Sequence, residues 1–475
     1  MNKIFLLTID SLNFEDFNKK NFPELFKFKK NFFKFSNYYI HGGPTLQSFQ
    51  SLFTMKTPLN GDGYNFGIKN KKTFLEKLKL RGFFTISLQT CKTFSSFYGY
   101  PEKFDEYKLI ANIYYEIFFF QKHFLAPLIH TFLKKRINEK QFINETIKVL
   151  DNFFQSLNLS IYKNFYEDYP NHFSEKRKKR FKEIIKDYQF NKKKFIMQNF
   201  RNFRFVSFFL LPFGKTITKF IPSIILFKID DFLFHNYILK NLYPLQDDVV
   251  NKILFMIKKN NIKSKKNLFF WTHFLDGHDA KAGDTNAYSD KKKLKYQTDK
   301  QRYYYALKTI DKSITNLIKK VEYIDEYKNA TFIISSDHGH GLNETKHATR
   351  NFNENFTHVP LTIYNKKINS KIIKTQYQNS NFFKILNQYL YKKKFVNDKS
   401  YLYFENKGKG YTKFNKENIY LKIKNNNQSI QSQAYIKNNK ICYTNNKFKK
   451  IFDTQKFIKY RKNIFEFLKR SQYRN

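Results

Sequence analysis

The sequence has 475 residues, which is enough for one large α/β domain and a smaller one, and excludes a peptide hormone or a small disulfide scaffold. It contains 87 Lys and Arg against 39 Asp and Glu, a formal net charge of +48, and 19% aromatic residues. Disordered chains combine high charge with few aromatic residues, so this chain is expected to fold.

The positive charge suits phosphate-rich partners such as nucleic acid, an anionic membrane, or a sulfated or phosphorylated substrate. The lysines are spread over every segment, however, which is more typical of solvated faces than of one binding surface. No helix-turn-helix, zinc-finger or aromatic RNA-binding signature is visible, so we expect no specific nucleic-acid partner.

Three features of the sequence predict a cytoplasmic location. Cys91 and Cys442 lie far apart, without disulfide or metal-site spacing, which fits a reducing compartment. The run from Ile4 to Ile9 is too short for a signal-peptide core. The most apolar stretches, 110–132 and 205–227, are interrupted by charged residues, so neither is expected to span a membrane.

Strand and helix patterns alternate over residues 1–105 and 265–370, which predicts one discontinuous α/β domain with a parallel sheet. Apolar runs predict strands, and helical spacing predicts a helix at 73–80 and another through 307–321. The predicted strands cover residues 3–9, 83–88, 267–274, 330–335 and 359–364.

Two further regions follow from composition. Residues 106–264 are rich in Lys, Phe and Ile at helical spacing and predict a helical insertion. We favour packing of this insertion on the core, and keep as the alternative a lid or basic surface that makes peripheral contact with a membrane. Residues 371–475 predict a small C-terminal α+β region, with a hairpin turning at Asn438-Asn439 and a last helix near 454–469.

Acidic and histidine residues follow the predicted strands. Asp10 ends the first strand, His273 lies at the end of the strand at 267–274, and Asp337-His338 follow the strand at 330–335. Thr45 follows Gly-Gly-Pro and precedes a helix-like segment. Ligands of open parallel sheets bind at the carboxyl ends of the strands, so these residues are expected to converge.

Two carboxylates and an imidazole form a mixed oxygen and nitrogen site suited to Zn, Mn, Mg or Ca. A hydroxyl beside such an ion is easier to deprotonate, and Thr45 would open a helix whose free N–H groups favour an anion. Together these residues predict metal-assisted attack on a phosphoryl or sulfuryl centre.

The ordered motifs resemble the sulfatase family of the alkaline-phosphatase superfamily. The resemblance covers about residues 1–105 and 265–365 and rests on the segments Ile9-Asp10-Ser11-Leu12, Gly42-Gly43-Pro44-Thr45, Trp271-Thr272-His273 with Asp276-Gly277-His278, Ser336-Asp337-His338-Gly339-His340 and Thr357-His358-Val359-Pro360. It implies an alkaline-phosphatase-like, mainly parallel sheet flanked by helices.

The resemblance also implies roles for single residues. Asp10, Asp337 and His338 would bind a divalent metal ion, and Thr45 would be the nucleophile and a further ligand. The histidines His278 and His347 would contact the ester oxygens or protonate the leaving group, and His273 is a weaker candidate for substrate contact. The remaining histidines, His340 and His358, would lie in the surrounding shell, His358 with a role in substrate binding.

The chain departs from the sulfatase pattern at three positions. Ser11 follows Asp10 where sulfatases have a second aspartate, Thr45 stands where they have the cysteine or serine that becomes formylglycine, and Phe49 stands where they have an arginine. Formylglycine cannot form from threonine, and a threonine nucleophile resembles phosphodiesterases and phosphoethanolamine or glycerophosphate transferases.

The predicted function is therefore hydrolysis of a phosphate or sulfate ester, an anionic substrate that includes sulfated or phosphorylated glycans. Two alternatives remain: transfer of a phospho-group to a glycan, and binding of an anion or polyanion without turnover.

Overall fold

The computed structural model describes most of the chain as far as residue 396 and four strands beyond it. The described residues are 2–41, 45–57, 67–110, 117, 120, 124–162, 166–167, 175–199, 246–275, 298–340, 354–392, 394–396, 401–407, 419–425, 428–437 and 440–443. In this part of the chain, no helix has the length and apolar composition needed to span a membrane.

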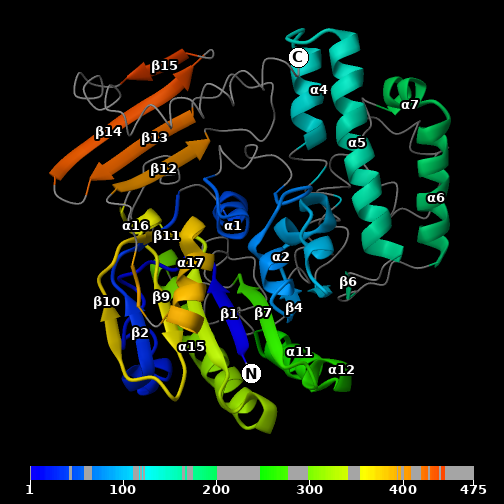
Figure 1. Cartoon of the computed structure of the whole chain (residues 1–475). Helices are drawn as coiled ribbons and strands as arrows, with labels where there is room; N and C mark the ends of the chain where they lie inside the picture. The colour runs from blue at the N-terminus through cyan, green and yellow to red at the C-terminus, as the bar shows by residue number, and fades with distance from the viewer. Residues whose placement is uncertain are drawn as a thin grey trace.

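A nine-stranded sheet of order β10-β2-β9-β8-β1-β7-β4-β5-β6 forms the centre of the molecule (Figure 1). Neighbouring strands from β8 to β6 pair in parallel, and β9 pairs antiparallel with both β8 and β2. The mainly parallel sheet predicted from the sequence is thus confirmed. The strands are β1 (Lys3–Ile9), β2 (Phe32–Phe35), β4 (Phe83–Gln89), β5 (Glu106–Ile110), β6 (Tyr166–Glu167), β7 (Asn267–Phe274), β8 (Thr331–Ser336), β9 (Leu361–Tyr364) and β10 (Lys371–Ile373).

The central strands are apolar on both faces because helices cover both sides of the sheet. Along β1, Ile4 and Leu6 belong to one buried cluster, while Phe5, Leu7 and Ile9 belong to the other. This alternation follows from the two-residue period of a strand. It explains why β1 reads as a continuous apolar run, as strands buried on both faces do.

The cluster that contains Phe5 lies under α11 (Gln246–Lys258), α12 (Asn260–Lys263) and α15 (Asp299–Glu322). A capping box formed by Thr298 and Gln301 starts α15, and its predicted apolar face, which includes Leu307 and Ile310, is fully buried. The cluster that contains Ile4 lies under α1 (Thr45–Thr54), α2 (Phe74–Lys79) and α17 (Phe382–Asn387).

The predicted insertion contains α4 (Ala126–Leu133), α5 (Glu139–Tyr162), α6 (Glu175–Phe190) and α7 (Lys192–Asn199), which Figure 1 shows gathered beyond the β4 side of the sheet. Phe154 of α5 contacts Phe181 and Tyr188 of α6, with ring centroids 6.2 and 5.1 Å apart. These three side chains belong to the same buried cluster as Ile4. The apolar face of α6 is therefore used for packing, and membrane contact by the insertion stays a prediction.

Several elements outside the predicted α/β segments join the central sheet or its helical layers. The strand β5 and the helix α11 lie between residues 106 and 264, yet β5 pairs with β4, and α11 packs beside α15. After residue 370, β10 pairs with β2, and Phe382 of α17 packs on Phe74 with ring centroids 5.6 Å apart.

Two smaller sheets complete the described strands. One joins β3 (Tyr38–Tyr39) in parallel to β11 (Tyr377–Gln378). The other is antiparallel and contains β12 (Tyr401–Lys407), β13 (Ile419–Asn425), β14 (Gln428–Lys437) and β15 (Lys440–Tyr443). Lys437 pairs with Lys440, as the predicted hairpin at Asn438-Asn439 requires. The helix predicted near 454–469 lies outside the described residues.

Candidate active site

Four of the predicted site residues come together at the carboxyl end of the sheet. Asp10 follows β1, Asp337 and His338 follow β8, and Thr45 is the first residue of α1. The ligand atoms of Asp10, Asp337 and His338 lie within 4.8 Å of one another. Oγ1 of Thr45 lies 3.5 Å from Nε2 of His338, and all four residues are buried.

Strand register brings Asp10 and Asp337 together although they lie far apart in the sequence. Ser11, the residue after Asp10, is 326 positions from Asp337. Ile9 pairs with Ser336 on one side and with Phe274 on the other. Asp10 and Asp337 therefore each directly follow the last residue of one of two neighbouring parallel strands, as the sequence predicted.

Within the described residues, one carboxylate oxygen of Asp337 accepts hydrogen bonds and the other has no donor. Its Oδ1 accepts hydrogen bonds from the backbone N–H groups of Ser11, at 3.1 Å, and His338, at 2.8 Å. Among the described residues no group donates to Oδ2, although this atom is buried and lies 3.3 Å from Nε2 of His338. Leaving a buried carboxylate oxygen unsatisfied is costly, and a bound cation would satisfy it.

His338 is held in the tautomer that suits a metal ligand. Its Nδ1 lies 2.9 Å from the carbonyl oxygen of Gly339, which can only accept, so Nδ1 carries the proton. The lone pair of Nε2 then faces the carboxylates, with Oδ1 of Asp10 at 3.8 Å and Oδ2 of Asp337 at 3.3 Å. Three electron-pair donors facing one another fit a divalent cation between them.

Ser11 adopts an uncommon backbone conformation next to these ligands. Its φ is 61°, in the left-handed region that non-glycine residues rarely occupy. This conformation lets Ser11 contact both carboxylates, because its hydroxyl donates to Oδ1 of Asp10 at 2.7 Å and its N–H donates to Asp337. The sequence marked Ser11 only as a departure from the family pattern and did not predict these contacts.

Tyr303 of α15 forms hydrogen bonds that hold the segment after β1 in place. The hydroxyl of Tyr303 donates to the carbonyl oxygen of Ser11 at 3.1 Å and also lies 3.3 Å from Oδ2 of Asp16. Burial raises the pKa of Tyr303 well above its usual value, so its hydroxyl stays protonated and keeps donating.

His273 lies behind Asp10 and is completely buried. Its Nε2 is 3.2 Å from Oδ2 of Asp10, and its Nδ1 is 3.0 Å from the hydroxyl of Thr8. An ionised carboxylate can only accept, so Nε2 of His273 donates to Asp10. This contact with a candidate metal ligand differs from the substrate contact that the resemblance implied for His273.

Gly339 is required by close packing beside the site. A Cβ at this position would lie 1.9 Å from the carbonyl oxygen of Asn355 and 2.4 Å from Oδ1 of Asn13. The N–H of Gly339 donates to the carbonyl oxygen of Phe356 at 2.8 Å. The glycine of the Asp-His-Gly motif therefore lets the segment after β8 lie directly on α16 (Glu354–Thr357).

The other predicted histidines are not part of this cluster in the described structure. The ring of His340 packs 5.0 Å from that of Tyr303. Nε2 of His358 lies 3.0 Å from the carbonyl oxygen of Ser36, and its ring stacks on Phe14 and Tyr39 with centroids 4.0 and 4.5 Å away. His278 and His347 lie outside the described residues, so their proposed contacts with the substrate stay predictions.

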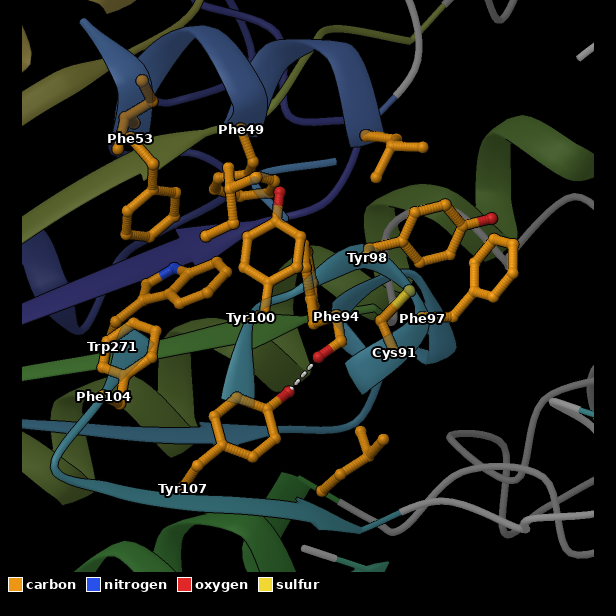
Figure 2. Packing of buried hydrophobic residues seen from close by; sticks show 14 of the residues in the cluster. Phe49, Phe53, Cys91, Phe94, Phe97, Tyr98, Tyr100, Phe104, Tyr107 and Trp271 are labelled. Carbon is orange, nitrogen blue, oxygen red and sulfur yellow. Dashed lines mark hydrogen bonds between the residues drawn. The ribbon is translucent and has the colours of Figure 1, made fainter. Parts of the chain in front are cut away.

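An aromatic cluster occupies the position where the resemblance implies an arginine. Phe49 of α1 is 1% exposed and contacts Trp271, Phe94 and His273, with ring centroids 5.0, 5.1 and 5.0 Å apart. Figure 2 shows Phe49 and Phe53 descending from α1 onto this cluster. Phe49 therefore offers no guanidinium group that could bind a substrate or a formylglycine side chain.

Comparisons with known proteins agree with this architecture. The sequence model described as Sulfatase matches residues 3–392. A putative sulfatase from Bacteroides thetaiotaomicron is similar in structure, with a TM-score of 0.52, 10% identity and coverage of 100% of this chain and 94% of that one. A structure described as a 2-O GAG sulfatase has a TM-score of 0.51 at 10% identity, with coverage of 100% and 93%.

A protein of the alkaline phosphatase superfamily from Vibrio parahaemolyticus has a TM-score of 0.50 at 12% identity, covering 100% of this chain and 88% of that one. Among curated proteins, none matches the sequence. At these identities the structural likeness supports the fold, while the family model spans most of the chain. The chain therefore belongs to the sulfatase family.

Proposed function

We propose that the protein is a metal-dependent hydrolase of a phosphate or sulfate ester in which Thr45 is the nucleophile. The observation that carries this proposal is the position of the Thr45 hydroxyl, 3.5 Å from Nε2 of His338 at the edge of the Asp10, Asp337 and His338 cluster. A threonine at the start of a helix also lies beside backbone N–H groups that attract an anion.

Asp10, Asp337 and His338 would hold the divalent ion, with Thr45 as a further ligand. Carboxylate oxygens suit Mg, Ca and Mn, and the imidazole nitrogen suits Zn, so the proposed ion is one of these four. A bound ion would polarise the ester and make the Thr45 hydroxyl easier to deprotonate.

In the proposed reaction, the Thr45 hydroxyl loses its proton to solvent and its oxygen attacks the phosphorus or sulfur atom. A bond from Oγ1 of Thr45 to this atom forms, the bond to the leaving alcohol breaks, and the alkoxide receives a proton. His278 and His347 are the proposed proton donors and contacts of the ester oxygens. Water then cleaves the Thr45 ester and releases phosphate or sulfate.

Two features favour phosphate over sulfate. Threonine cannot become formylglycine, and the arginine that accompanies formylglycine in sulfatases is replaced by the buried Phe49. Phosphoryl transfer to a hydroxyl needs neither feature, because positioning and charge stabilisation supply most of its catalysis.

The threonine also favours a second candidate, transfer of a phospho-group to an alcohol in place of water. In that reaction the Thr45 intermediate is the same, but the acceptor is a hydroxyl group of a glycan. A sulfated or phosphorylated glycan is the proposed substrate class in either case, and the +48 charge of the chain would attract such an anion.

The test is a comparison of esters with matched variants. Protein freed of metal and reloaded with Mn, Zn, Mg or Ca is assayed on nitrophenyl phosphate, bis-nitrophenyl phosphate and nitrophenyl sulfate, with and without an alcohol acceptor. We expect cleavage of a phosphate ester, loss of activity on the order of 10³-fold in Thr45→Ala, and partial activity in Thr45→Ser. Metal binding without cleavage of any ester would instead support an anion-binding protein.

A further inference from the structure

A buried asparagine from the C-terminal part of the chain bridges both sides of the nucleophile segment. Asn379 opens the short helix η12 (Asn379–Asn381) and is 1% exposed. Its Oδ1 accepts a hydrogen bond from the backbone N–H of His41 at 3.2 Å. Its Nδ2 donates to the carbonyl oxygen of Ser48 at 2.9 Å and to the hydroxyl of Ser48 at 3.1 Å.

His41 and Ser48 stand on either side of Thr45 in the sequence, so one amide group holds the chain before the nucleophile and the helix after it. A second contact strengthens the first side, because Nε2 of His41 lies 2.7 Å from the hydroxyl of Ser380. The parallel pairing of Tyr39 with Gln378 in β3 and β11 brings both segments to this point in register.

We infer that Asn379 is a positioning residue that sets where the Thr45 hydroxyl lies relative to His338. The inference rests on the proposed function of Thr45. A side-chain amide suits this task because it offers an acceptor and two donors in one rigid plane. Without the Asn379 amide, the His41 N–H and the Ser48 carbonyl would each lose a buried hydrogen bond, which destabilises the present position of α1. We therefore expect α1 to shift in variants that lack this amide. Small displacements of a reacting group reduce turnover strongly.

The chain offers a matched control in Asn365. This residue is also buried, and its Nδ2 lies within hydrogen-bond distance of the carbonyl oxygen of Asn329, at 3.0 Å, and the hydroxyl of Thr331, at 3.1 Å. Its Oδ1 accepts from the N–H of Lys367 at 2.9 Å. The Asn365 amide thus also bonds on both sides, although its Oδ1 partner is only two residues away. Asn365 follows β9 and contacts the start of β8, at the end of that strand opposite Asp337.

The experiment compares Asn379→Leu and Asn379→Ala with Asn365→Leu in the full-length protein. Turnover of the best ester, the Kd for the metal ion, and hydrogen exchange of the backbone amides of α1 are measured for each. We expect kcat to fall roughly 10- to 100-fold in the Asn379 variants, with faster exchange in α1. KM and the metal Kd should change much less than kcat, because Asp10, Asp337 and His338 still bind the ion. In Asn365→Leu, kcat and exchange in α1 should match the wild type.

Equal kcat and equal α1 exchange in the Asn379 and Asn365 variants would overturn the inference. The exchange measurement needs no turnover, so it shows whether Asn379 holds α1 even if Thr45→Ala shows that Thr45 is not the nucleophile. If Asn379→Leu does not fold, Asn379→Ala leaves space for water and supplies the same comparison.

Discussion

Nε2 of His273 donates a hydrogen bond to Oδ2 of Asp10 over 3.2 Å, from the fully buried side of that carboxylate. A histidine that orients a ligating carboxylate fixes its direction and charge, and such outer partners commonly change metal affinity 10- to 100-fold. This contact gives the first prediction.

His273→Asn should weaken metal binding by about 10- to 100-fold, while His273→Gln should retain most of the affinity. Glutamine can place an amide nitrogen near the position of Nε2, whereas the shorter asparagine cannot reach Asp10. Titration calorimetry with Mn or Zn measures both affinities. Equal affinities in the two variants would show that the contact with Asp10 does not act on the ion.

Asp337→Asn should change stability in opposite directions with and without metal. In metal-free protein the variant should unfold at a higher temperature, because it removes a buried carboxylate whose Oδ2 has no hydrogen-bond donor among the described residues. The gain should be about 1–3 kcal/mol. With metal present, the wild type should be the more stable protein. Thermal unfolding in chelator and in Mn tests this, and lower stability of the variant in chelator would refute it.

Ser11 allows the contribution of its hydroxyl to be separated from that of its backbone. Ser11→Ala and Ser11→Gly both remove the donor to Asp10 and should weaken metal binding equally. Ser11→Gly should be more stable than Ser11→Ala by about 1 kcal/mol, because glycine accepts the φ of 61° without a Cβ clash. Thermal unfolding in chelator measures the difference, and a more stable alanine variant would contradict the argument.

Gly339→Ala should destabilise the protein by about 1–3 kcal/mol and weaken metal binding, since the new Cβ would lie 1.9 Å from the carbonyl oxygen of Asn355. Gly82→Ala is the control: its φ is 75°, but nothing lies within 4 Å of its added Cβ. Gly82→Ala should lower the free energy of unfolding only by the strain of placing alanine at a positive φ, about 1–2 kcal/mol, and should leave the metal affinity unchanged. Normal metal affinity in Gly339→Ala would exclude a role of this packing in the site.

The fold could be predicted from the sequence where strands are buried on both faces. The runs at 3–9 and 267–274 coincide with β1 and β7, and the helix predicted at 73–80 is α2. Thr73 stands at the N-cap position of α2, but its side chain makes no capping hydrogen bond. Short strands such as β2 and β5 were missed because they have only four and five residues, of which two and three are buried, so neither forms a continuous apolar run.

The site was predictable to the extent that parallel strands end together. Asp10, Asp337 and His338 each follow a recognisable strand, and Thr45 begins α1 as the Gly-Gly-Pro sequence before it indicated. The donation from His273 to Asp10 and the bridge from Asn379 could not be predicted, because each depends on side-chain direction across elements far apart in the sequence. The φ of Ser11 could not be predicted either, because serine rarely adopts this backbone conformation. Of these three residues, His273 and Ser11 stood in motifs that resemble the family, and Asn379 stood in none.

The most direct test of the central claim is to trap the covalent intermediate. Metal-loaded protein turning over a phosphodiester is quenched in acid and digested, and the peptide that contains Thr45 is sequenced by mass spectrometry. The account predicts a phosphoryl-bearing adduct on Thr45 that is absent from Thr45→Ala. An adduct on any other residue, or undiminished turnover by Thr45→Ala, would contradict it.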